Sequence, residues 1–244
     1  MNKGRAAMLS GVLGIALLAW VLTYLNIGPA MGMPMLPIDL VALGLFTAAW
    51  TIGMVAMMFP TAVPMLLMFM HVGRNSTEEV RAGGGPTVGK AILFVGSYIG
   101  VWIATGVLFY VATAYLLGAL PLEANAFIGT TTGLGAALIV VAVYQLSPVK
   151  GECLARCHPS SFLFKSYSGG LQGSVAMGLN YAKYCVGCCW VMMAFLLISA
   201  SMGLAWMSAF ALIIFAERNF TLKTWTPKLF GLGFLAAGAV LVVV

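Results

Sequence analysis

The chain has 244 residues, of which 62% are hydrophobic and only 7% are charged. Soluble globular domains carry about a quarter charged residues, so this composition excludes such a domain, and it equally excludes a disordered chain. The net charge of +6 includes no run of adjacent basic residues, which argues against nucleic acid as a partner. The composition therefore predicts a polytopic membrane protein.

Continuously apolar runs predict an all-α fold, a transmembrane helix bundle of about seven spans. We expect one transmembrane domain over residues 1–244, with its first run retained as a helix because that run is longer than the apolar core of a secretory signal. We expect the second span to be broken, because Pro60 and Pro64 each remove an intrahelical hydrogen bond. The expected spans are residues 8–25, 38–59 with a broken continuation to 70, 91–118, 128–146, 184–201, 204–217 and 229–244.

The basic residues predict the orientation of these spans. With seven crossings, all twelve Lys and Arg residues fall on the side that holds the N-terminus, and the opposite loops at 26–37 and 119–127 contain none. By the positive-inside rule the N-terminus is cytoplasmic and the C-terminus external. The predicted location is the cytoplasmic (inner) membrane of a prokaryote, surrounded by lipid, with residues 147–183 as a cytoplasmic loop that contains cysteine.

Three of the five cysteines form a cluster in the fifth expected span. Cys185, Cys188 and Cys189 stand at helical spacing and Met192 continues in phase, so that one helix face carries all four sulfur atoms. A reduced compartment disfavours a disulfide framework. Soft sulfur donors favour Cu(I), with zinc or an iron–sulfur cluster as competitors. Gap-filling by buried Cys and Met gives the same pattern and stays open as an alternative.

A second pair of cysteines lies in the predicted inner loop. Cys153 and Cys157 are four residues apart and His158 follows, which suits a shared metal if this loop forms a helical turn. A thiol redox pair is an alternative, because the neighbouring Arg156 and Lys150 favour a thiolate. Simple packing of the two cysteines also remains open.

Methionines add thioethers in two places. Met33 and Met35 lie in the first external loop, where thioethers stay ligands in an oxidising compartment that would oxidise thiols. Met54, Met57 and Met58 share one face of the second expected span. We treat all five as candidate copper ligands, with ordinary packing as the alternative.

Ionisable side chains are expected only at the ends of spans, as with Asp39 and Glu217. A proton-coupled transporter or an acid–base enzyme normally buries at least one such group along its path. No Ser/His/Asp array or carboxylate pair is evident, so the sequence predicts no catalytic site.

Three motifs identify a resemblance. They are Trp50-x3-Met54-x2-Met57-Met58-x-Pro60, then Tyr144-Gln-Leu-Ser-Pro-Val-Lys150-x2-Cys153-x3-Cys157, and Cys185-Val-Gly-Cys188-Cys189-Trp190-x-Met192, followed by Glu217-Arg218. At these positions, over residues 50–218, the sequence resembles a bacterial and archaeal family of predicted metal-binding integral membrane proteins, a domain of unknown function. The resemblance implies a metal-binding role without a defined substrate.

Taken together, these features predict a membrane protein that binds a soft metal, Cu(I) foremost, through Cys and Met side chains and transfers or delivers it. Its expected partner is a metallochaperone or a larger membrane metalloenzyme. One alternative is a non-catalytic accessory subunit of such an enzyme. Another is a thiol redox protein that uses Cys153 and Cys157.

Overall fold

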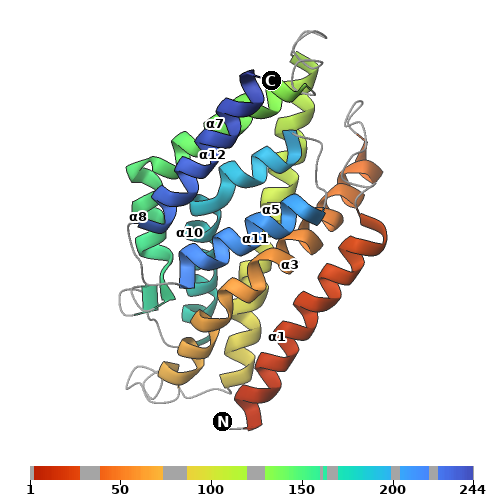
Figure 1. Ribbon diagram of the computed structural model, residues 1–244. Helices are drawn as coiled ribbons and strands as arrows, with labels where there is room; N and C mark the ends of the chain where they lie inside the picture. Colours follow the sequence, from red (N-terminus) through yellow and green to blue (C-terminus); the bar gives the residue numbers. More distant parts are fainter. Residues whose placement is uncertain are drawn as a thin grey trace.

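The computed structural model describes residues 3–27, 39–73, 87–119, 130–159, 162–163, 170–198, 204–219 and 225–243. Within these ranges the chain is helical and contains no strand, which confirms the predicted all-α class (Figure 1). The elements are α1 (Lys3–Leu22) with a π-helical turn (Thr23–Ile27), α3 (Leu40–Gly73), α5 (Thr87–Ala119), α7 (Thr131–Leu146), α8 (Pro148–Cys157), α10 (Gly170–Ile198), α11 (Leu204–Asn219) and α12 (Trp225–Val243).

Four of these helices, α3, α5, α10 and α12, are long and apolar enough to cross a membrane. Helices α7 and α8 meet at an angle of 63° and make a fifth span if the bent pair is counted as one. The apolar part of α1 is shorter than a full crossing, and α11 has only 16 residues. By length and composition, the described chain thus supports four or five spans where the sequence predicted about seven.

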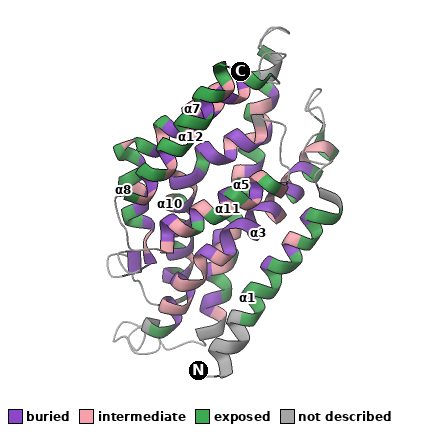
Figure 2. Cartoon of the chain, in the orientation of Figure 1, coloured by how far each residue is buried: buried purple, intermediate pink, exposed green. Residues whose placement is uncertain are grey.

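Helix α10 lies at the centre of the bundle. Within its span window 56% of the residues are buried, against 17% for α12. It packs closely on α5 and α8, α5 packs on α3, and α3 on α1, while α7 and α12 run side by side along the far edge (Figure 1). Figure 2 shows the same gradient, with buried residues along α3 and α10 and exposed residues along α1 and α12.

The bend between α7 and α8 is encoded locally by a serine followed by a proline. The Ser147 hydroxyl donates to the Tyr144 carbonyl at 2.7 Å and accepts from the Lys150 backbone N–H at 3.3 Å, so it closes one helix and caps the next. Pro148 occupies the first turn of α8, where its missing N–H costs nothing. The chain therefore turns sharply here and carries α8 back toward α10.

Two expectations about the helices need correction. Helix α3 continues through Pro60 and Pro64 to Gly73, so the expected break at residue 59 is wrong. Neighbouring helices can compensate for the hydrogen bonds that prolines remove, and side chains of α1 and α5 lie beside this stretch of α3.

Helix α10 begins at Gly170 rather than at residue 184. Its first half buries one stripe at helical spacing and exposes Asn180 and Lys183 on the other side. Because apolar and polar residues alternate in this way, the first half of α10 does not appear in the sequence as a continuous apolar run. The expected loop at 147–183 accordingly consists largely of α8 and the start of α10.

Candidate metal centre

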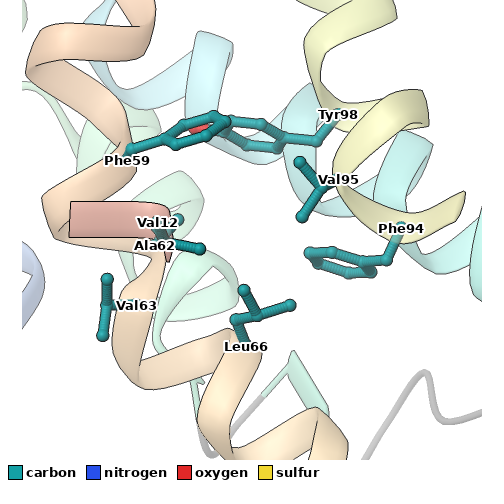
Figure 3. Close-up of a pocket in the computed structure, with 8 residues that line it drawn as sticks. All are labelled: Val12, Phe59, Ala62, Val63, Leu66, Phe94, Val95 and Tyr98. Carbon is teal, nitrogen blue, oxygen red and sulfur yellow. The ribbon is translucent and has the colours of Figure 1, made fainter. Parts of the chain in front are cut away.

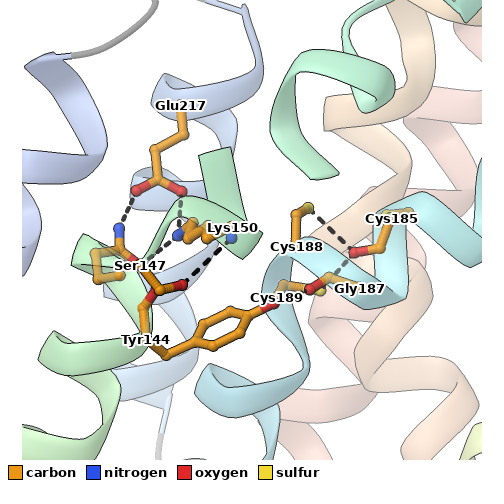
Figure 4. Close-up of polar contacts among 9 residues, drawn as sticks. Tyr144, Ser147, Lys150, Cys185, Gly187, Cys188, Cys189 and Glu217 are labelled. Carbon is orange, nitrogen blue, oxygen red and sulfur yellow. Dashed lines mark hydrogen bonds and ion pairs between the residues drawn. The ribbon is translucent and has the colours of Figure 1, made fainter. Parts of the chain in front are cut away.

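Helix α10 places three thiols inside the bundle. Cys185, Cys188 and Cys189 are at most 3% exposed. The thiols of Cys188 and Cys189 both donate to the Cys185 carbonyl at 3.1 Å, which holds them on one side of the helix (Figure 4). Met192 is buried one turn further on. The sulfur face of α10 therefore points into the interior of the bundle.

A fourth buried thiol comes from α8. Cys157 is completely buried, and the thiols of Cys185 and Cys188 are its main electrostatic neighbours. Cys153, one turn earlier, is half-buried, and its Sγ lies 3.3 Å from the place that a Cβ on Gly187 would take. A glycine at this position therefore lets α8 approach α10 closely. All five cysteines are free thiols.

Helix α3 contributes a thioether to the same place. The Sδ of Met58 lies 3.9 Å from the Sγ of Cys185, and both side chains are fully buried. Met54 and Met57 are buried on the same helix. Sulfur atoms from α3 and α10 thus meet in the core, and Cys157 of α8 is buried next to the same thiols.

The remaining predicted ligands lie elsewhere or are not placed. His158 is the capping residue that follows α8, and it is half-buried. Met33 and Met35 lie outside the described residues. Of the predicted residues, the structure brings together Cys157, Cys185, Cys188, Cys189 and Met58.

A buried arginine stands beside these thiols. Arg218 of α11 is 1% exposed, and its Nη1 donates to the Cys185 Sγ at 3.1 Å and to the Thr61 hydroxyl at 2.8 Å. Its Nη2 donates to the Tyr181 hydroxyl. The hydroxyl of Tyr98 lies 3.2 Å from the same sulfur. Cys185 is therefore surrounded by hydrogen-bonding groups, two of which come from the facing helices α5 and α11.

A separate buried polar network lies next to this group (Figure 4). Lys150 Nζ lies 2.7 Å from a carboxylate oxygen of Glu217, and the side chains of both are at most 3% exposed. The Gln145 amide donates to Glu217, and its oxygen accepts from Lys150. The network joins α7, α8 and α11. Glu217 stands in the last turn of α11, as expected for the end of an apolar run, and is also buried and paired there.

The geometry limits the kind of metal complex that can form. Within the described ranges, no three Cys, His, Asp or Glu side chains are grouped so as to hold one ion. A structural zinc site has four such ligands, and even a catalytic zinc site has three. Cu(I) also accepts two thiolates in a linear arrangement, optionally with a weak thioether. A pair of thiols beside Met58 fits this simpler complex.

A small crevice between α1, α3 and α5 offers no metal ligands. Its volume is about 20 Å³, room for one water molecule at most, and its lining is apolar apart from the hydroxyl of Tyr98 (Figure 3). The ring of Tyr98 forms part of this wall, while its hydroxyl reaches Cys185. Tyr98 therefore separates the crevice from the sulfur cluster.

Sequence reasoning missed Arg218 and its neighbours, although a signal was present. Arg218 follows Met207, Phe210 and Ile214 at spacings of three or four, and all four are buried on one face of α11. A charged residue in phase with the apolar face points inward. The aromatic residues Tyr98 and Tyr181 carried no comparable signal.

Residues 47–241 match the family model described as "PpoB2: Copper chaperone". No curated protein and no solved structure matches the chain. The family match covers most of the 244 residues, so the chain belongs to this family, and copper is the metal that it handles.

Proposed function

We propose that this member of the PpoB2 copper chaperone family binds Cu(I) inside a transmembrane helix bundle and delivers it to a copper-requiring protein. One observation carries the proposal: Cys157 of α8, Cys185 of α10 and Met58 of α3 converge in the buried core. Packing alone needs no such convergence of sulfur from three separate helices.

The ligands that we assign are two thiolates with a thioether beside them. Cys185 is one thiolate and Cys157 is the other, because both are fully buried and Cys157 interacts first with the Cys185 thiol. Met58 supplies the thioether. Soft ligands of this kind select Cu(I) over harder divalent ions. The half-buried Cys153 is the thiol through which copper enters or leaves.

The membrane arrangement is part of the proposal. We place the N-terminus in the cytoplasm and the C-terminus outside, in a prokaryotic inner membrane, with seven crossings in which α1 and α11 are short spans. Fusion of a phosphatase that is active only outside the cytoplasm, after residue 78 and after residue 124, tests this. Activity is expected only at residue 124, and activity at residue 78 would contradict the orientation.

The partner that we propose is a membrane or secreted metalloenzyme that requires copper. A chaperone has to hold its cargo against adventitious binding and then release it to another protein. A buried site of few ligands with the half-buried thiol of Cys153 nearby suits both requirements, because ligand exchange can proceed one sulfur at a time.

Elemental analysis of the protein purified in mild detergent under reducing conditions tests the binding site. The unaltered protein should retain about one copper ion per chain and no stoichiometric zinc. The variants Cys185→Ser and Cys157→Ser should lose most of this copper, because each removes one of the two thiolates. A matched control is Met207→Leu, which changes a fully buried sulfur on α11 outside the cluster.

Equal copper in the control and in both cysteine variants would contradict the ligand assignment. Copper absent from the unaltered protein after reconstitution with Cu(I) would contradict the function itself. Co-purification with a larger metalloenzyme, with no copper retained by the isolated chain, would instead support the accessory-subunit alternative.

A further inference from the structure

The charge of Arg218 is unbalanced within the part of the chain that the structure describes. Arg218 is 1% exposed, and no carboxylate there lies within ion-pair distance of it. The adjacent Glu217 is paired with Lys150. A guanidinium keeps its charge under all ordinary conditions, and burying an unpaired charge is strongly unfavourable. The core therefore needs a negative charge next to Arg218.

The groups around the guanidinium show where this charge belongs. Thr61 and Tyr181 are neutral hydroxyl acceptors, whereas the third acceptor is the Cys185 sulfur at 3.1 Å from Nη1. The Arg218 Nε is buried and has no hydrogen-bond partner among the described residues, so one more donor is available on the same group. The guanidinium is thus held in position by two hydroxyls and directed at the sulfur cluster.

We propose that Arg218 is the counter-cation of a Cu(I) site made of two thiolates, and that it thereby sets both the charge and the ligand number of the bound complex. This inference rests on the proposed function. Cu(I) with two thiolates carries one negative charge, and the guanidinium neutralises it. A third thiolate would leave one negative charge unbalanced in the core.

The same charge count disfavours divalent cargo. Zn(II) with two thiolates is neutral, so the charge of Arg218 would remain unbalanced. Neutrality beside Arg218 would then require three thiolates on Zn(II), and the described residues offer no group of three ligands around one position. Arg218 is therefore a specificity-determining residue that acts through Cys185.

The first test compares Cu(I) affinities in detergent by competition with a chromophoric Cu(I) chelator. Arg218→Gln should weaken Cu(I) binding by about 10- to 100-fold, because it removes a charged partner of a buried thiolate. Arg218→Lys should recover part of this loss, since it keeps the charge without the planar fork. The control Arg156→Gln removes an exposed charge near the site and should change the affinity by less than about threefold.

A double-variant cycle separates an electrostatic role from a merely structural one. If Arg218 acts through the Cys185 thiolate, then Arg218→Gln should weaken binding far less in a Cys185→Ser background than in the unaltered protein. An equal loss in both backgrounds would overturn the inference. Equal Cu(I) affinity of Arg218→Gln and the unaltered protein would also overturn it, although the proposed function would stand.

X-ray absorption spectroscopy of the unaltered protein loaded with Cu(I) gives a measurement that does not depend on the folding of any variant. Two short copper–thiolate distances per ion are expected, with at most one longer thioether contact. Three or more thiolates per ion would overturn the charge match. A failure of the unaltered protein to bind Cu(I) would count against the proposed function instead.

Discussion

The buried pair of Lys150 and Glu217 allows a quantitative test of how the helices around the site are held together. Their side chains are 1% and 3% exposed, and the charged atoms lie 2.7 Å apart. Replacing Lys150 by Met leaves the Glu217 carboxylate buried with only the Gln145 amide as a partner. Removing one member of such a pair typically lowers the free energy of unfolding by about 3–5 kcal/mol. Because the contact with the Gln145 amide remains, we expect a loss of about 3 kcal/mol.

For a chain of this length, about 1 kcal/mol corresponds to about 2–4 °C in melting temperature, so Lys150→Met should lower it by roughly 6–12 °C. Thermal unfolding in detergent, followed by circular dichroism, measures this. The double variant Lys150→Met with Glu217→Gln should recover at least half of the loss, because a neutral amide needs no counter-charge. The control Lys183→Met removes an exposed lysine of α10 and should be nearly neutral. A single variant as stable as the double variant would refute the reasoning.

Two glycines offer further tests of the packing. A Cβ on Gly178 would lie 2.5 Å from the Phe94 carbonyl oxygen of α5. The variant Gly178→Ala should therefore force α5 and α10 apart, lower the free energy of unfolding by about 1–3 kcal/mol and reduce the copper content. The control for both measurements is Gly151→Ala, because a Cβ there would meet no described atom within 4 Å. A Cβ on Gly238 would lie 2.8 Å from a backbone oxygen of α7, so Gly238→Ala should lower the melting temperature by a few degrees, about 2–8 °C. Gly233→Ala on the same helix has open space around it and should leave the melting temperature unchanged or slightly raised.

The helical class and the approximate positions of most helices were predictable, because a membrane requires continuous apolar helices. The length of the apolar runs did not predict the helix bounds correctly where a helix is covered by other helices. The first half of α10 is one such place, since its buried stripe is interrupted in the sequence by exposed polar residues such as Asn180 and Lys183. The continuity of α3 through Pro60 is another, because a proline inside a helix is tolerated where neighbouring helices pack against it.

For the candidate site, helical spacing was sufficient to place Cys185, Cys188 and Cys189 on one side of one helix. It was not sufficient to bring Cys157 or Met58 to them, since these contacts join residues far apart in the sequence. They depend on the 63° bend between α7 and α8 and on the packing of α3 near α10. The inward direction of Arg218 was available from the periodicity of α11 but was obscured by its place beside Glu217 at the end of an apolar run.

Glu217 and Arg218 show how one turn of α11 serves two separate purposes. Glu217 meets Lys150 and Gln145, so the charges on that side cancel within the protein and the network fixes α7, α8 and α11 to one another. Arg218 meets Thr61, Tyr181 and Cys185, where no carboxylate among the described residues opposes it. If Arg218 served stability alone, an acidic partner would be expected on its side as well, because an unpaired buried charge is costly. The asymmetry is accounted for if the missing negative charge belongs to the copper-bound state. Disrupting the Lys150 pair should then chiefly lower stability, whereas neutralising Arg218 should chiefly lower the affinity for Cu(I).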